Sequence, residues 1–159
     1  MTETDRRVRL RPAEAGEQAP DSSSRWDDWG KRDGPPPAEL HRLLVEVDGA
    51  VVGDVSWHSV WYGPNDASRA VNIGISLIPA ARGRGLGTRA QRALVEHLFA
   101  TTAVNRVEAS TDVDNVAEQR SLEKAGFRRE GVLRSAQGRA DGLHDLAVYA
   151  VLRADLDAD

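Results

Sequence analysis

The sequence predicts a mixed α/β (α+β) fold in a single domain, residues 1–159. Three observations predict it: short β-rich runs fill most of the chain, two helical stretches lie between them, and an Asp48-Gly49 dipeptide marks a hairpin. The length falls within the range of about 100–200 residues that is usual for one domain. With 40% hydrophobic and 29% charged residues, the composition is that of an ordinary globular protein.

The first predicted strand is short and is followed by a long polar segment. Residues Arg7–Arg11 alternate in polarity and stop at Pro12, as an edge strand does. Residues 14–37 are rich in Ser and Pro, yet they contain Trp26 and Trp29. Two tryptophans in a polar segment indicate that it packs over something, so we expect a loop or lid.

Three β-rich runs come next. Residues 41–47 and 50–61 flank Asp48-Gly49, a turn that favours a hairpin. A third run, 69–78, is closed by Pro79. Together these runs predict an antiparallel meander.

The second half of the chain alternates helices and strands. Residues 86–101 predict a helix whose buried stripe repeats at helical spacing. That stripe comprises Ala90, Ala93, Leu94, His97, Leu98 and Thr101. The remaining elements are a strand at 105–111, a helix at 115–125 ended by Gly126, and strands at 127–133 and 143–152.

Composition excludes several classes of function. Because the chain has no Cys, it has no disulfide, no thiolate catalyst and no Cys-ligated metal. With 25 acidic and 21 basic residues the net charge is −4, so a nucleic-acid partner is not expected. No apolar run reaches the ~18 residues of a membrane span and the first residues contain no secretory signal. We therefore expect a cytoplasmic protein without membrane association, either a monomer or a homodimer.

The most informative stretch is Arg82-Gly-Arg-Gly-Leu-Gly-Thr88, which leaves a strand and opens a helix. Its glycines, Gly83, Gly85 and Gly87, let the backbone approach a ligand, and the helix start favours a phosphate. Arg82 and Arg84 add positive charge. The loop lacks the Gly-Lys-Ser/Thr of a Walker A motif and has the wrong spacing for a dinucleotide fingerprint.

Three motifs in order carry a family resemblance. They are Arg82 to Thr88 after the strand Asn72-Ile-Gly-Ile-Ser-Leu77, then Asn115 through Glu123-Lys124-Ala-Gly126-Phe127, then Arg129-Glu-Gly-Val-Leu-Arg134. With these motifs the chain resembles the GCN5-related N-acetyltransferase (GNAT) superfamily, and within it the RimJ/RimL-type subgroup that acetylates ribosomal-protein N-termini. The resemblance implies the GNAT fold, a mostly antiparallel twisted sheet of six to seven strands flanked by helices.

The resemblance also implies a cofactor site and a reaction. The acyl donor would be acetyl-CoA, without a metal, and the acceptor a small-molecule or peptide amine. The amine would attack the thioester directly, with a base taking its proton. The backbone at Leu77 and Ile78 would bind the pantetheine arm, and Asn115 would contact the cofactor across the cleft. The pyrophosphate would lie on Arg82, Gly83, Arg84, Gly85, Leu86, Gly87 and Thr88.

Two departures from the family pattern concern catalysis. Many relatives carry a Glu on the strand before the glycine loop, where this chain has Asn72, which can orient a water or the substrate but cannot take a proton. Relatives place a Ser or Tyr on the second helix to protonate the leaving thiolate, where this chain has Glu118 and Leu122. The spacing Asn115-x-x-Glu118 resembles a capping box, and we expect Glu118 to serve the helix start.

Strand parity supplies candidate catalytic and acceptor residues. On the run 51–60, Asp54, Ser56 and His58 share a face, and Asn72 and Ser76 share a face of the next strand. If the two faces meet, His58 is a candidate base, with Asp54 orienting it; alternatively this face meets solvent. The candidate acceptor pocket consists of Trp26, Trp29, Ser56, Trp57, Ser76 and His144, although core or loop packing would also explain the aromatic residues.

Two other functions fit the same residues. Asn72, Glu118 and Leu122 are also compatible with a CoA-binding module that has little catalysis. A GNAT-fold transferase that uses an aminoacyl-tRNA is the other alternative, which the acidic composition disfavours.

Overall fold

The computed structural model describes residues 7–157, and it confirms the mixed α/β fold. The seven strands form one sheet in the order β1-β2-β3-β4-β5-β7-β6. The strands are β1 (Val8–Arg11), β2 (His41–Val47), β3 (Ala50–Trp61), β4 (Arg69–Leu77), β5 (Arg106–Asp112), β6 (Arg128–Arg139) and β7 (Gly142–Leu152). The helices are α1 (Leu86–Thr101), α2 (Val116–Lys124) and α3 (Arg153–Leu156), with short 3₁₀ turns η2 (Arg25–Asp27), η3 (Asp66–Ser68) and η4 (Pro79–Ala81). No helix among the described residues has the length and apolar character needed to cross a membrane.

The predicted meander β2-β3-β4 is present, and its turn chemistry explains it. Asp48 and Gly49 both have positive φ, 51° and 81°, the combination that a two-residue hairpin turn requires. The register pairs Asp54 with Ser76, Ser56 with Gly74 and His58 with Asn72. Paired residues project to the same face, so the polar face predicted from parity is correct.

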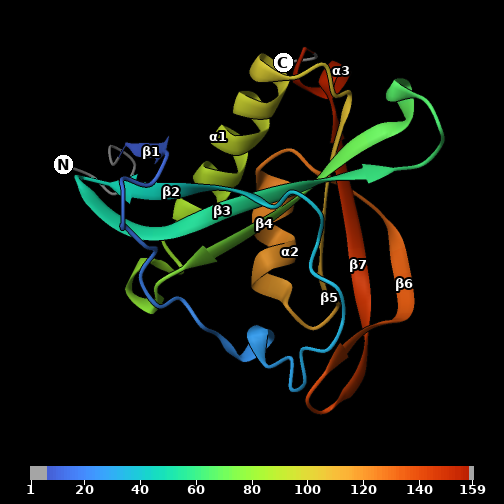
Figure 1. Ribbon diagram of the computed structural model, residues 1–159, viewed down its shortest axis with the longest axis horizontal. Helices are drawn as coiled ribbons and strands as arrows, with labels where there is room; N and C mark the ends of the chain where they lie inside the picture. The colour runs from blue at the N-terminus through green and yellow to red at the C-terminus, as the bar shows by residue number, and fades with distance from the viewer. Residues whose placement is uncertain (1–6, 158–159) are drawn as a thin grey trace.

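The last hairpin is longer than the sequence predicts. β6 continues through Arg139 instead of ending at Leu133, and it turns directly into β7. Most side chains of β6 are exposed, so no hydrophobic alternation marks the added residues. The tip of the hairpin lies beside η2, in the polar segment of residues 14–37 that contains Trp26 and Trp29 (the Trp26 segment). There the Ala140 N–H donates to the Asp28 carbonyl at 2.9 Å (Figure 1).

The hydrophobic core lies between the sheet and the mutually packed helices α1 and α2. The predicted bounds of α1 are correct, but its buried stripe is rotated from the predicted one. Ala90, Leu94 and Leu98 are buried as expected, whereas His97 and Thr101 are exposed. The stripe instead includes Gln91, Val95 and Phe99. Gln91 lies on the side that faces α2, where it hydrogen-bonds Ser121 and Glu118.

The sheet opens between its two central strands. β4 and β5 are parallel, and they pair only at Val71 with Val107 and at Asn72 with Glu108. Beyond these two pairs the strands diverge, as Figure 1 shows. The residues Ile73–Leu77 therefore pair with β3 on one side and with no strand on the other.

Candidate active site

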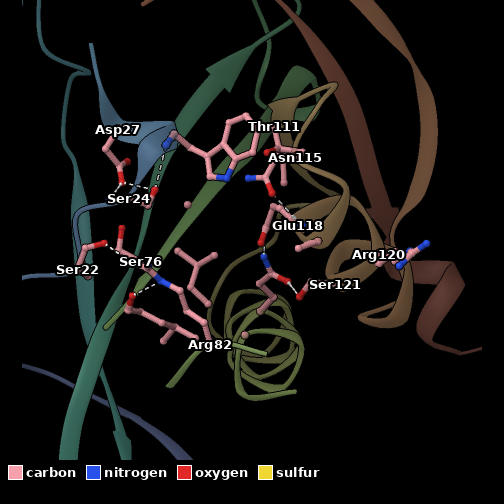
Figure 2. A pocket seen from close by; sticks show the side chains of 18 of the residues that line it. Ser22, Ser24, Asp27, Ser76, Arg82, Thr111, Asn115, Glu118, Arg120 and Ser121 are labelled. Carbon is pink, nitrogen blue, oxygen red and sulfur yellow. Dashed lines mark hydrogen bonds between the residues drawn. The ribbon is translucent and has the colours of Figure 1, made fainter. Parts of the chain in front are cut away.

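A cavity of about 750 Å³ occupies the opening between β4 and β5. Its volume lies within the range of about 300–1,000 Å³ that is usual for small-molecule sites. The walls come from β4, the loop before α1, α1 itself, α2, the end of β5, the end of β6 and the Trp26 segment; Figure 2 shows these walls from close by. Of the predicted site residues, ten line it: Trp26, Trp29, Ser76, Leu77, Arg82, Gly83, Gly85, Gly87, Thr88 and Asn115.

The β4 wall is an open strand edge. Successive residues of an extended strand direct their N–H and C=O groups to alternate sides. Over Ile73–Leu77 one side bonds β3, and the other side faces the cavity. An extended ligand with amide groups can pair there as an added strand does. Ile78 does not share this role, because its N–H donates to the Val52 carbonyl and its C=O accepts from Ala81.

The start of α1, at the other end of the same wall, has a geometry that suits an anion. Gly83 and Gly85 have φ of 69° and 74°, a left-handed conformation that glycine adopts without strain. The first bond of the helix runs from the Arg89 N–H to the Gly85 carbonyl, so the N–H groups of Leu86, Gly87 and Thr88 precede the helical ladder. Gly85 supplies no side-chain cap. These three donors and the positive helix dipole suit a phosphate.

Arg82 has a structural role that sequence reasoning did not foresee. Its Nε donates to the Leu77 carbonyl at 2.9 Å, and its NH2 group donates to the Ser22 and Ser23 carbonyls at 2.8 and 3.1 Å. Arg82 therefore ties the segment before η2 to the end of β4. Its charge still lies at the cavity rim, but its donors serve backbone carbonyls.

Four polar side chains connect α1 to α2 along the cavity. Thr88 Oγ1 lies 3.0 Å from Ser121 Oγ, Ser121 Oγ donates to Gln91 Oε1 at 3.0 Å, and Gln91 Nε2 donates to Glu118 Oε1. All four residues line the cavity. Figure 2 shows Asn115, Glu118 and Ser121 in succession on the face of α2 that borders it.

The capping-box prediction is correct for Asn115 and wrong for Glu118. Asn115 Oδ1 accepts from the Glu118 N–H at 3.3 Å, which caps α2. The Glu118 carboxylate turns away from the helix start and bonds Gln91 instead. Burial raises the pKa of Glu118 to about 7, and the hydrogen bond from Gln91 opposes this only in part. The acid is therefore substantially protonated at neutral pH.

This raised pKa predicts a pH-dependent stability. Between about 4.5, the ordinary value, and about 7 the folded state holds a proton that the unfolded state has released, so stability falls as pH rises through this window. The variant Glu118→Gln lacks this penalty. We expect it to match the wild type near pH 4.5 and to exceed it by up to ~3 kcal/mol in free energy of unfolding at pH 8. Urea denaturation at both pH values measures this; Glu96→Gln, exposed on α1, is the control. An equal difference at both pH values would contradict it.

The Trp26 segment is held over the cavity by Arg139. The guanidinium lies 4.8 Å from the Trp29 ring centroid and 5.9 Å from that of Trp26, and it donates to the Trp26 carbonyl. Its Nε lies 3.5 Å from Asp112 Oδ2, and both side chains are buried. These contacts hold Trp26 and Trp29 at the cavity, and the lid function of residues 14–37 stays a prediction.

His144 belongs to the same cluster and does not line the cavity. Its ring nitrogens bond Asp141 and Asp112, and these two carboxylates raise its pKa. Burial alone would raise the pKa of Asp112, but the Asp114 N–H, His144 and Arg139 hold it below its ordinary value. His144 therefore supports the carboxylate that Arg139 faces, rather than the acceptor pocket directly.

The structure brings the candidate catalytic residues together but leaves them outside the cavity lining. Asp54 and Ser76 form a cross-strand pair, as do His58 and Asn72, so all four share a face; only Ser76 lines the cavity. Asp54 is buried and bonds Arg42 at 2.5 Å, which explains its place on the strand without catalysis.

The remaining predicted residues serve other purposes or lie elsewhere. Ser56 pairs with Gly74 across the strands; Gly74 lines the cavity, and Ser56 does not. Trp57 projects to the opposite face, where it stacks on His41 at 5.2 Å and meets His97 at 6.1 Å. Arg84 and Leu86 belong to the glycine loop, but their side chains stay out of the cavity lining, and Leu86 is buried in the core.

Comparison with known proteins decides the family. The family described as "Acetyltransferase (GNAT) domain" matches residues 4–128. The chain belongs to the GNAT acetyltransferase family. The helix start and the open strand edge described above both lie within the matched residues.

Individual relatives agree with this GNAT assignment. The chain is 33% identical over 113 residues to "Probable N-acetyltransferase YjcK" of Bacillus subtilis; the aligned residues make up 71% of this chain and 61% of the relative. It is 41% identical over 58 residues to "Aminoglycoside N(6')-acetyltransferase type 1" of Klebsiella pneumoniae; the aligned residues make up 36% of this chain and 29% of the relative. Its fold matches that of Mycobacterium smegmatis RimJ in complex with CoA-disulfide with a TM-score of 0.66 and 25% identity, over 74% of this chain and 55% of that chain. The chain therefore spans less than two thirds of the length of these relatives.

The residues of this GNAT cavity that were not predicted as site residues include Gln91, Ser121 and Arg139. A Gln on an apolar helix stripe is a signal for Gln91, since a buried amide needs a partner. Ser121 follows Glu118 by three residues, the spacing of neighbours on one helix face. Arg139 gave no signal, because its role depends on a hairpin whose length the pattern does not reveal.

Proposed function

We propose that this protein is an acyl-CoA-dependent N-acyltransferase that moves an acetyl group from acetyl-CoA to a primary amine by direct attack. The observation that carries the proposal is the meeting of two features in one cavity. Unbonded helix N–H groups suit the pyrophosphate, and the open edge of β4 suits the amide-bearing pantetheine arm. The thioester carbonyl would then lie deeper between β4 and α2.

Two measurements test this function. Calorimetric titration with acetyl-CoA, with CoA and with S-acetylpantetheine, which lacks the pyrophosphate, should show micromolar binding of the two CoA species and much weaker binding of S-acetylpantetheine. A panel of amines should then show transfer, and it should include ribosomal-protein N-termini and aminoglycosides, because one relative is named "Putative ribosomal N-acetyltransferase YdaF" and another "Aminoglycoside N(6')-acetyltransferase type 1". Binding without transfer to any amine would indicate a CoA-binding module. Absence of binding would overturn the proposal.

His58 remains our proposed general base, with its cross-strand partner Asn72 as its positioning neighbour, and it can be tested directly. Asp54 cannot orient His58, because it pairs with Ser76 four residues further along β3 and bonds Arg42. His58 pairs with Asn72 on β4, and Asn72 lies two residues before Gly74, which lines the cavity. This places His58 near the edge of the cavity, which supports the proposal. We expect His58→Ala to lower kcat by on the order of 100-fold with the Kd for acetyl-CoA unchanged, the usual scale of general-base loss. Ser59→Ala, on the opposite side of the strand, is the control. Equal kcat in wild type and His58→Ala would remove His58 from the mechanism.

A further inference from the structure

We propose that Glu118 is the general acid of the transfer reaction, donating a proton to the sulfur of the leaving thiol from its Oε2 atom. The inference rests on the proposed function and adds a residue to its mechanism. It starts from the position of Glu118 in the cavity and from the orientation that its neighbours impose on the carboxyl group.

The first step is where Glu118 lies relative to a bound thioester. A Cβ built on Gly87, in the first turn of α1, would lie 3.6 Å from both Leu77 Cδ1 and Ser121 Oγ. The phosphate end of the cavity, the open edge of β4 and helix α2 therefore converge at this point. Glu118 precedes Ser121 by three residues on the same face of α2, about 5 Å further from the phosphate end. An extended arm that runs along β4 from the helix start passes Ser121 first and then Glu118.

The second step is which carboxyl oxygen holds the proton. Ser121 Oγ donates its hydrogen to Gln91 Oε1, so the hydroxyl of Thr88 supplies the hydrogen between Thr88 and Ser121. With its Oε1 occupied in this way, Gln91 directs Nε2 toward Glu118 and donates to Oε1. When the carboxyl group of Glu118 is protonated, the oxygen that accepts from Gln91 is its carbonyl oxygen, which leaves the proton on Oε2.

The third step is whether the carboxyl group is protonated when needed. Gln91 is 2% exposed, and the site is shielded between α1 and α2. Burial raises the pKa of Glu118 to about 7, and its Gln91 partner is neutral. Six other charged side chains line the cavity: Arg25, Asp27, Arg82, Arg120, Lys124 and Arg139. In the described part of the chain, the carboxylate of Glu118 bonds Gln91 and none of these six.

The chemical step balances with this assignment. The amine nitrogen forms a bond to the acyl carbon, and its proton passes to the base and then to solvent. The C–S bond breaks with its electron pair going to sulfur, while the proton on Glu118 Oε2 moves to the same sulfur. The products are the amide and the free thiol, and Glu118 regains its proton from water. General-acid assistance of this kind contributes about 100-fold or more.

The test compares wild type with Glu118→Gln, which keeps the size and the hydrogen bond to Gln91 but has no acidic proton. We expect kcat to fall on the order of 100-fold while the Kd for acetyl-CoA stays within twofold. The wild-type kcat should decline as pH rises through about 7, because the acid loses its proton. In Glu118→Gln this decline should be absent. Glu118→Asp should recover part of the activity, and Glu96→Gln should behave as wild type.

The outcomes separate the two proposals. If the wild type acetylates an amine and Glu118→Gln keeps a kcat within threefold of it, or keeps the alkaline decline, the role of Glu118 is overturned and the proposed function stands. If the wild type acetylates no amine of the panel, the proposed function fails and the role of Glu118 fails with it. A loss confined to KM or to acetyl-CoA binding would make Glu118 a binding residue and would also overturn the inference.

Discussion

Gly85→Asp is expected to weaken acetyl-CoA binding by more than ~100-fold, or about 2.7 kcal/mol, while leaving the fold in place. Gly85 is the N-cap of α1 with φ of 74°, and an added Cβ there would meet no atom within 4 Å. Asp is one of the few side chains that tolerate this conformation. Its carboxylate would accept from the first N–H groups of α1 and would repel a phosphate from the same place.

Titration calorimetry measures this loss, and circular dichroism checks the fold. Gly85→Asn is the matched control, because its side chain has the same shape without the charge, so it should lose less affinity than Gly85→Asp. Unchanged affinity in Gly85→Asp would show that the phosphates bind elsewhere. That result would overturn the proposed cofactor site.

Arg139→Ala should lower the free energy of unfolding by about 3 kcal/mol, the lower end of the scale for removing one partner of a buried charge pair. The side chains of Arg139 and Asp112 are 7% and 1% exposed, and the substitution leaves the buried carboxylate with only His144 and the Asp114 N–H as partners among the described residues. It also removes the guanidinium that stacks on Trp29 and bonds the Trp26 carbonyl. The lid should therefore loosen, and the KM for the acceptor should rise.

Urea denaturation measures the stability, and limited proteolysis between residues 22 and 34 measures the lid. Arg128→Ala is the control, because Arg128 lies on the same strand, is 76% exposed and pairs with Asp155 at the surface. It should cost less than about 1 kcal/mol. A loss below 1 kcal/mol in Arg139→Ala would show that the cluster does not hold the lid.

The parts of the fold that the sequence predicted are those with strong local signals. The hairpin of β2 and β3 follows from Asp48-Gly49, and α1 follows from a glycine loop and a long periodic run. β6 was predicted too short because its polar end is held by backbone pairing with β7, which needs no apolar side chains. The packing of Trp26 and Trp29 against the rest of the domain could be predicted from the sequence, but not their contact with Arg139.

In the candidate site, too, residues with a local sequence signal could be predicted, and residues that depend on contacts between elements could not. The glycine loop and Asn115 could be predicted to lie at the site because their signal depends on backbone conformation and on fixed spacing, and both line the cavity. Glu118 was assigned to the helix start because a capping box is a local pattern, whereas its partner Gln91 belongs to another helix. Which face of α1 is buried could not be predicted from its apolar residues alone, because α2 covers a side of the helix that includes the polar residue Gln91. Contacts between elements therefore decided what local patterns could not.

The short pairing of β4 with β5 has a consequence for folding cooperativity. It divides the sheet into two hairpin-built units, β1–β4 and β5–β7, joined by two backbone pairs, by the packing of α1 on α2 and by side-chain contacts such as that of Tyr62 with Glu108. A ligand that pairs along the open edge of β4 while contacting α2 bridges both units, so its binding energy adds to their mutual stability. Acetyl-CoA should then act as a missing central strand, raising amide-exchange protection in both units together rather than only at the residues it touches.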